Sequence, residues 1–309
     1  MKKILVLGGT GFLGTNLCTY LLNYDYDVVS YSRKLHSPVC QFPEISYVQG
    51  DFLQEVNFAR LIDGVDIIFH LISTTQPANQ NMSKEFKSNV IPTVNLLDAC
   101  IGRRIKIIFF SSGGTVYGIP RYTPIDESHR TNPISPYGIH KLTLEKCLEY
   151  YGYMYGIDYM ILRISNPYGA YQDPNGKQGA IAVFLSKAIM NRTIEIWGDG
   201  SVVRDYIYVD DVMKACISLL NYHGGKRIFN ISSGTGYSIN KVLGFIEQKI
   251  NHPLSVQYIR GRKQDVPVNV LDNRLLEKEC NWRCDVNLEM GIDKMMQLWN
   301  SKINAFVEE

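Results

Sequence analysis

The segment KILVLGGTGFLGTNLCTYLL, residues 3–22, decides the fold because its character changes at a run of glycines. The apolar residues before the run are typical of a buried strand, and those after it show the spacing of a helix. Gly9, Gly11 and Gly14 complete the pattern G-x-G-x-x-G. Glycines allow a tight turn and a close approach of backbone to a pyrophosphate, which the helix N-terminus attracts. We therefore predict a dinucleotide site formed by Gly8, Gly9, Thr10, Gly11, Phe12, Leu13 and Gly14.

Strand and helix patterns alternate through the first half of the chain. Runs typical of strands lie at residues 3–8, 27–32, 45–51, 66–72, 106–112 and 159–165, and helical patterns lie between them at 11–24, 58–63, 84–102 and 137–156. Parallel strands need a crossover, which is usually a helix. The alternation therefore predicts an α/β fold with a Rossmann-like, doubly wound parallel sheet. Pro92 should kink the third helical segment or mark its start.

The rhythm loosens after about residue 166. Turn-rich segments at 168–179 and 197–206 stand among helical patterns near residues 182–190, 209–220, 239–250 and 288–299. We expect residues 1–166 to form the dinucleotide-binding domain and residues 167–309 to form a smaller α+β lobe, with the chain crossing between the two. The chain has no repeat and no long charged linker, so we expect the lobes to pack around a cleft.

Composition narrows the classes of partner. The 309 residues are 45% hydrophobic and 20% charged with a net charge of +2, which is typical of a soluble globular protein and gives no electrostatic case for nucleic acid or an anionic membrane. No apolar segment approaches the roughly 20 residues needed to cross a bilayer. The seven cysteines are scattered without C-x-x-C spacing, which fits reduced thiols in a cytoplasmic protein and no metal site.

The end of the second strand bears on the choice of dinucleotide. An acidic residue there would hold the adenosine ribose of NAD, but DVVSYSRK offers Ser32 and Arg33, which suit the 2′-phosphate of NADP. Ser32 and Arg33 therefore leave NADP open beside NAD, but Arg33 would equally stack on adenine or face solvent, so these residues do not decide between the two dinucleotides. Asp51, followed by Phe52, is either a contact on the adenine side or a turn residue at the end of a strand.

A tyrosine and a lysine four residues apart are candidates for the chemistry. The pattern Y-x-x-x-K occurs as Tyr137 with Lys141, Tyr222 with Lys226, and Tyr237 with Lys241. Tyr137 opens the helix after the fifth strand, near the sheet edge where ligands bind, and Ser135 and Pro136 suit the start of that helix. A tyrosine must lose about three pKa units to act as a base near neutral pH. Lys141 and a positively charged nicotinamide favour the phenolate, and Lys141 would also anchor the nicotinamide ribose.

The chain resembles, over nearly its whole length, the extended branch of the short-chain dehydrogenase/reductase superfamily and, within it, the NAD-dependent nucleotide-sugar epimerases and dehydratases such as the UDP-glucose 4-epimerases. The motifs that carry the resemblance are, in order, GGTGFLG, SSGGTVYG, SPYGIHK, LRISNPYG, GDGSVVRDYIYVDDV and RGRKQD. The resemblance implies a bound NAD, a UDP-hexose substrate, a homodimer and a part in polysaccharide biosynthesis.

The resemblance also implies contacts with the substrate, at Asn89, Asn166, Arg204, Arg262, Asp265 and Asn269. Arg204 and Arg262 would offer paired donors to a diphosphate, which lysine does not reproduce. Asn89 would otherwise be a helix-cap residue. Asn269 matches a position whose size tunes the tolerance of an N-acetyl group in related epimerases.

The segment SSGGTVYG bears on the type of reaction. Similar dehydratases and decarboxylases carry Asp or Glu there, whereas this chain has Gly113, Gly114 and Thr115. The two-step epimerase/reductase type needs a cysteine and histidine pair, and no cysteine matches. The remaining chemistry needs Tyr137, a nicotinamide and a hydroxyl, for which Thr115 is the first candidate and Ser112 the second.

We therefore expect a 4-epimerase that inverts C4 of a UDP-hexose, glucose/galactose or the N-acetyl form, through a transient 4-keto sugar. The first alternative is an NADP(H)-dependent 4-keto-sugar reductase or dehydrogenase, which Ser32 and Arg33 would suit. The second is a protein that senses a dinucleotide without turnover.

Overall fold

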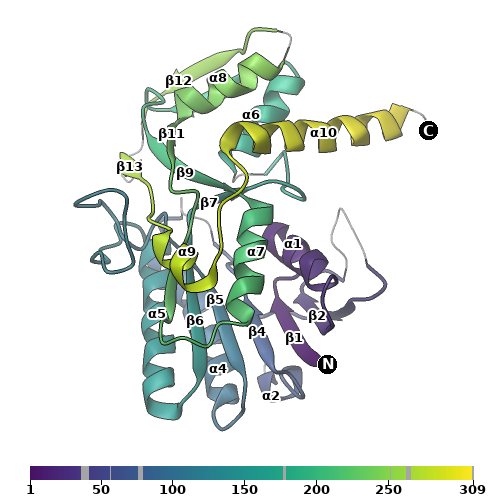
Figure 1. Ribbon diagram of the computed structural model, residues 1–309, viewed down its shortest axis with the longest axis vertical. Helices are drawn as coiled ribbons and strands as arrows, with labels where there is room; N and C mark the ends of the chain where they lie inside the picture. Colours follow the sequence, from purple (N-terminus) through teal and green to yellow (C-terminus); the bar gives the residue numbers. More distant parts are fainter. Residues whose placement is uncertain are drawn as a thin grey trace. The chain divides into compact units, whose positions relative to one another are not determined.

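The computed structural model describes residues 1–35, 42–55, 57–75, 79–176, 179–250, 252–261 and 266–307 (Figure 1). The chain forms two compact units. Unit 1 consists of Met1–Gly118, Arg130–Ile164 and His223–Phe229, and unit 2 consists of Ile119–His129, Ser165–Tyr222 and Asn230–Glu309. The chain therefore passes between the units more than once.

A seven-stranded sheet in the order β10-β6-β5-β4-β1-β2-β3 organises the first unit. Its strands are β1 (Lys2–Leu7), β2 (Tyr26–Ser32), β3 (Ser46–Gln49), β4 (Ile67–His70), β5 (Lys106–Ser112), β6 (Asp158–Ile164) and β10 (Ile228–Ile231). The pairings from β3 across to β6 are all parallel. The helices of this unit are α1 (Phe12–Leu21), α2 (Phe58–Leu61), α3 (Met82–Glu85), α4 (Ile91–Cys100) and α5 (Pro136–Tyr155). The order confirms the Rossmann-like sheet predicted from the alternation of patterns.

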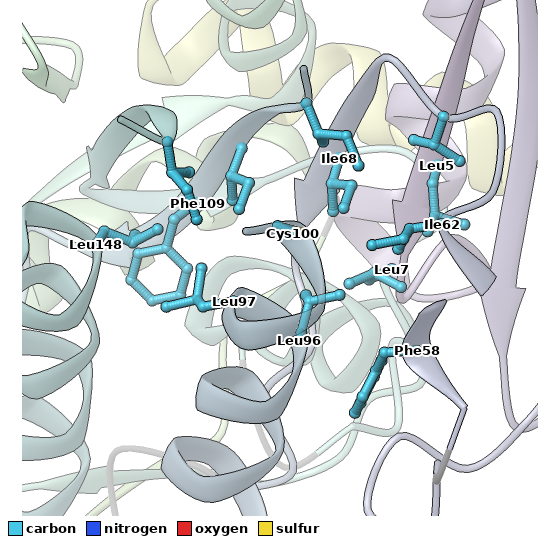
Figure 2. Packing of buried hydrophobic residues seen from close by; sticks show 14 of the residues in the cluster. Leu5, Leu7, Phe58, Ile62, Ile68, Leu96, Leu97, Cys100, Phe109 and Leu148 are labelled. Atoms are coloured by element: carbon cyan, nitrogen blue, oxygen red, sulfur yellow. The ribbon is translucent and has the colours of Figure 1, made fainter. Parts of the chain in front are cut away.

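Helices α2, α4 and α5 share one hydrophobic core with the sheet. Figure 2 shows Leu96, Leu97 and Cys100 of α4 pointing toward strand residues that include Ile68 and Phe109. Successive side chains of a strand point to opposite faces, and all four residues of Ile4–Leu7 are buried. Both faces of β1 are therefore covered, as parallel sheets require.

Pro92 marks a change of helical register. A π-helical turn, η1 (Phe86–Val90), connects α3 to α4, and Pro92 lies in the first turn of α4. Proline has no N–H to donate to the carbonyl four residues earlier, so the helical ladder cannot continue regularly across this point. The helical segment itself begins at Met82, so Pro92 does not mark its start but lies where the π-helical turn passes into α4.

Unit 2 contains short strands and longer helices. Its strands are β7 (Asn166–Tyr168), β8 (Ile194–Trp197), β9 (Val203–Tyr208), β11 (Gly236–Ser238), β12 (Val256–Ile259) and β13 (Val268–Asn269), and its helices are α6 (Ala180–Ile189), α7 (Val209–Leu220), α8 (Ile239–Lys249), α9 (Arg274–Cys280) and α10 (Leu288–Val307). Strand β9 pairs with β7, β11 and β13, while β8 pairs with β12. The sequence predicts helices α6, α7, α8 and α10 but not these strands.

Candidate active site

The start of α5 fixes the predicted Tyr137 and Lys141. Ser135 is the N-cap, and its side chain accepts a hydrogen bond from the Gly138 amide at 3.1 Å. Pro136 is the first helical residue, as predicted. Tyr137 and Lys141 therefore lie one turn apart on the same helix.

Lys141 is a buried cation beside the tyrosine ring. Its Nζ donates to the Phe110 carbonyl at 2.8 Å and lies 5.8 Å from the centre of the Tyr137 ring. Burial lowers the pKa of Lys141 to about 8, although Glu145 and Glu85 act in the opposite direction. The site therefore holds an ammonium group that titrates close to neutral pH.

Burial acts against the ionisation of Tyr137. It raises the pKa of Tyr137 to about 12, while Ser73 lowers the pKa and the charge of Glu85 raises it. The lowering expected from Lys141 does not outweigh this burial. Tyr137 therefore needs a further positive charge beside its ring before it can act as a base near neutral pH.

The turn after β5 carries the two candidate hydroxyls. The Ser112 carbonyl accepts from the amides of Thr115 and Val116 at 3.2 and 3.1 Å. A Cβ on Gly138 would lie 2.8 Å from the Thr115 carbonyl oxygen, so this glycine lets α5 start close against the turn. The Thr115 Oγ1 is buried and has no hydrogen-bond partner among the described residues. It is therefore available to a ligand.

A buried ionic network beneath this turn was missed from the sequence. Glu145 accepts from Ser111 Oγ at 2.5 Å and from Arg163 Nη2 at 2.6 Å. Arg163 also donates to the Tyr117 hydroxyl at 3.0 Å. These contacts tie β5, β6 and α5 together behind the site. The available signal was Arg163 itself, a charge inside an apolar strand pattern, because a buried charge requires a partner.

Asn89 is held by protein groups. Its Oδ1 accepts from the Thr74 amide at 2.9 Å, and its Nδ2 donates to Thr75 Oγ1 and Glu85 Oε2, both at 3.1 Å. The side chain is buried in η1 and orders the segment after β4. Its contact with substrate stays a prediction.

The first turn of unit 1 leaves no room for side chains at two of its glycines. A Cβ on Gly9 would lie 2.3 Å from Ser30 Oγ, and one on Gly14 would lie 2.1 Å from the Gly8 carbonyl oxygen. Gly11 caps α1 without a side-chain hydrogen bond, so the first amides of the helix keep their capacity for an anion. This arrangement fits a pyrophosphate.

Among the other predicted dinucleotide contacts, some side chains form hydrogen bonds or pack within the protein, and one is exposed. Thr10 Oγ1 donates to Ser32 Oγ at 2.9 Å, and Ser32 donates to the Lys34 carbonyl at 2.7 Å. Arg33 is exposed. Asp51 accepts from the Leu53 amide at 3.1 Å, as a turn residue does, and the Phe52 side chain lies in the hydrophobic core. The contacts of these residues with a dinucleotide stay predictions.

Three of the predicted substrate residues lie on neighbouring strands of unit 2. Asn166 on β7 donates to the Asp205 carbonyl at 2.9 Å, and Arg204 on β9 donates to the Val266 carbonyl at 2.6 Å. Asn269 on β13 pairs in register with Arg204 and is buried. The structure brings these three side chains onto one small sheet. Arg262 and Asp265 lie outside the described residues.

In the described part of the chain, no cluster of three or more histidine, cysteine or acidic side chains could bind a metal ion. Among the helices of those residues, none combines the length and the apolar character needed to span a bilayer.

Comparison with known proteins identifies the family. Residues 4–232 match the family described as NAD dependent epimerase/dehydratase. The chain belongs to this family. A UDP-glucose 4-epimerase of Mycolicibacterium smegmatis is 31% identical over 312 residues, which cover 97% of this chain and 99% of the relative. A dTDP-4-dehydro-6-deoxyglucose reductase of Escherichia coli is 32% identical over 310 residues, which cover 95% and 96%.

A solved structure extends the similarity to the whole fold. The crystal structure of a UDP-glucose 4-epimerase with UDP-glucose from Thermotoga maritima superposes with a TM-score of 0.91 at 30% identity, covering 97% of this chain and 99% of that one. Membership of the NAD dependent epimerase/dehydratase family confirms the predicted family, the enzyme class and NAD as the cofactor.

Proposed function

We propose that the protein is a nucleotide-sugar 4-epimerase that inverts C4 of a UDP-hexose. The observation that carries the proposal is the pair formed by the partly buried Tyr137 and the buried Lys141 at the start of α5, next to a turn whose residues 113–115 carry no carboxylate. Glu85 and Glu145, the acidic residues packed near this pair, are fully buried and engaged by other side chains. Around this pair, the described residues therefore offer no free carboxylate as the acid or base for elimination, while proton transfer at a hydroxyl remains supported.

The glycine turn, Ser32, Arg33 and Asp51 would hold NAD, with Lys141 at the nicotinamide ribose. NAD, when bound, supplies the hydride acceptor and donor for C4 and a positive charge that favours the Tyr137 phenolate. Tyr137 takes the proton of the 4-hydroxyl and returns it when the 4-keto sugar is reduced on its other face. Thr115 Oγ1 holds the same sugar oxygen in line with Tyr137, and Ser112 is the second candidate for that hydrogen bond.

The substrate would be held through its nucleotide and sugar by the residues predicted from the resemblance, which lie in unit 2 except for Asn89 in unit 1. Arg204, with Arg262, would bind the diphosphate, and Asp265 the ribose. Asn166 and Asn89 would contact the sugar nucleotide, and Asn269 would set the tolerance for an N-acetyl group. The two relatives described as UDP-glucose 4-epimerases support a UDP-hexose.

The reductase reading keeps specific support. The Escherichia coli relative at 32% identity is named for reduction of a 4-keto sugar, and the residues at the end of β2 are Ser32 and Arg33 instead of an acidic residue. A reductase consumes one reduced cofactor per turnover, whereas an epimerase consumes none.

Replacement of Tyr137 by phenylalanine tests the proposed chemistry. We expect Tyr137→Phe to fold and to retain dinucleotide but to lose at least about 100-fold in turnover of UDP-glucose and UDP-galactose, because general acid/base catalysis contributes at least that factor. Tyr237→Phe, which alters the same pattern in unit 2, should keep its activity. Near-normal turnover by Tyr137→Phe would overturn the assignment.

We also propose a homodimer. Exposed apolar side chains occur on the two adjacent helices α4 and α5, where Ile91, Tyr150, Tyr153 and Met154 are each more than half exposed in the single chain. Such surface is costly to leave in water. Sedimentation equilibrium of the purified protein measures the assembly directly.

Free cysteines at every described cysteine position support a reducing, cytoplasmic environment. The proposed product suits polysaccharide biosynthesis.

A further inference from the structure

A buried carboxylate lies beside the proposed catalytic pair without a part in the chemistry described above. Glu85, the last residue of α3, is 0% exposed. Its carboxylate accepts from the Thr75 hydroxyl in a short hydrogen bond, from Asn79 Nδ2 at 2.5 Å and from Asn89 Nδ2 at 3.1 Å. Burying a charge costs free energy unless hydrogen-bond partners surround it. The three donors therefore hold the Glu85 carboxylate in one specific position.

The same carboxylate reaches α5. His140 Nδ1 lies 2.7 Å from Glu85 Oε2, although neither ring nitrogen of His140 has a well-directed hydrogen bond among the described residues. Two lone pairs would repel at that distance, so Nδ1 is the ring nitrogen that carries the proton. The His140 ring packs edge-on against the Tyr137 ring, with the ring centres 5.0 Å apart. Glu85 therefore restrains the ring against which Tyr137 rests.

A second path leads from Glu85 to the tyrosine hydroxyl. Thr75, which Glu85 binds, has a carbonyl that accepts from Ser73 Oγ at 3.2 Å. The Ser73 side chain also lies close enough to Tyr137 to lower the pKa of the phenol. The segment of residues 73–75 is held further by Asn89, which accepts from the Thr74 amide. One carboxylate thus supports both the ring of Tyr137 and the partner of its hydroxyl.

We infer that Glu85 is a positioning residue for Tyr137, acting through His140 on its ring and through Thr75 and Ser73 on its hydroxyl. The inference rests on the proposed function, in which Tyr137 moves the proton of the sugar hydroxyl. Around the Tyr137 and Lys141 pair, the other titratable groups are His70 on β4, His140 on α5 and Glu145 on α5. Ser73 is the second positioning residue in this arrangement.

The charge of Glu85 and the hydroxyl of Ser73 shift the pKa of Tyr137 in opposite directions. A pH profile detects these shifts, and a merely structural role would not produce them. The carboxylate raises the pKa of Tyr137, and Ser73 lowers it. Loss of the charge in Glu85→Gln should therefore move the basic-group limb of the pH profile of kcat/KM to lower pH. Loss of the hydroxyl in Ser73→Ala should move the same limb to higher pH.

Values of kcat distinguish the effect of the position of Glu85 from the effect of its charge. We expect Glu85→Ala to lower kcat by roughly 10- to 100-fold with a nearly unchanged KM, because a small displacement of a catalytic group has effects of this size. Glu85→Gln keeps the shape and part of the hydrogen bonding, so its kcat should stay several-fold above that of Glu85→Ala. Glu149→Gln is the matched control. It removes the carboxylate of Glu149 from an ion pair with Lys146 on the surface of α5, and it should leave kcat and the pH profile unchanged.

Full kcat in a folded Glu85→Ala protein would overturn the inference, as would pH limbs of Glu85→Gln and Ser73→Ala that superpose on that of the unaltered protein. If Glu85→Ala does not fold, the two conservative variants decide by their pH limbs alone. Failure of the proposed function is distinguishable, because it requires activity in Tyr137→Phe. If Tyr137→Phe is inactive while the Glu85 and Ser73 variants keep the kcat and pH profile of the unaltered protein, only the positioning role of Glu85 is wrong.

Discussion

At the scale of single residues, the hydroxyl of Thr115 is the most informative feature of the site. Buried polar atoms are nearly always paired, yet Thr115 Oγ1 has no partner among the described residues. Its backbone meanwhile packs against Gly138, directly after Tyr137 on α5. A sugar hydroxyl bound beside Tyr137 would satisfy it.

Valine at position 115 keeps the shape of threonine and removes this hydrogen bond. We expect Thr115→Val to cost roughly 1.5 to 3 kcal/mol in the transition state, or about ten- to over a hundredfold in turnover, because the bond lies next to a developing charge. Steady-state kinetics with UDP-glucose measures the loss. Full activity with ordinary substrate binding would assign the hydrogen bond to Ser112 or to a backbone amide of the turn instead.

At the scale of elements, the connection between β1 and α1 separates two functions of glycine. A Cβ on Gly14 would lie 2.1 Å from the Gly8 carbonyl oxygen, whereas one on Gly11 would lie 3.3 Å from that oxygen. The first contact is impossible without moving the backbone, and the second needs only a small adjustment. Gly14 therefore serves the packing of α1 on the turn, and Gly11 serves the approach of a ligand.

Alanine at each position should expose this difference. We expect Gly14→Ala to lower the free energy of unfolding by about 1 to 3 kcal/mol or more, through overpacking, and to lose the dinucleotide as well. Gly11→Ala should unfold at nearly the same temperature as the unaltered protein but retain less dinucleotide after purification. Thermal unfolding combined with analysis of the released dinucleotide measures both quantities. Equal stability of the two variants would contradict this assignment.

The sequence predicts the elements of unit 1 better than those of unit 2. Strands β1, β2, β4, β5 and β6 carry runs of buried residues that face both sides of the sheet, so composition marks them, whereas the edge strand β3 is largely exposed. Strands β7, β11 and β13 have only two or three residues and lie among turns, and their pairing with β9 joins segments far apart in the chain. Short periodic signals cannot report such pairing.

The residues of the candidate site also differ in how well the sequence predicts them. Tyr137 and Lys141 follow from a local pattern, since Ser135 and Pro136 fix where the helix starts. Glu85 contacts α5 only through the fold, from more than fifty positions earlier in the chain. No spacing rule connects such residues, and this is why the sequence does not predict the buried carboxylate or its partners.

At the scale of the whole molecule, His70 couples stability to pH. It joins β4 to α4 through a 2.9 Å contact with Thr93 and is almost fully buried. Burial, with a contribution from Lys141, lowers the pKa of His70 to about 3. In the unfolded chain His70 takes up a proton below about pH 6.5, whereas the folded protein resists protonation until near pH 3. Stability is therefore unaffected above pH 6.5 and is lost as the pH falls below it.

This loss should be about 1.4 kcal/mol per pH unit for His70, or roughly 2 kcal/mol at pH 5. Urea unfolding at pH 7.5 and pH 5 measures it. The variant His70→Gln cannot take up this proton, so its stability should fall less between the two pH values by about that amount. His223→Gln, at an exposed position, should show the same pH dependence as the unaltered protein. An unchanged pH dependence in His70→Gln would mean that His70 is protonated in the folded state.

In the proposed reaction, the hydrogen removed from C4 of the sugar returns to C4 within the same site. UDP-glucose carrying deuterium at C4, incubated with the purified protein without added cofactor, tests this most directly. The proposed 4-epimerase chemistry predicts that UDP-galactose forms and keeps the deuterium at C4, even in the presence of unlabelled NADH or NADPH. Conversion that depends on added NADPH, or product that has lost the deuterium, would contradict it.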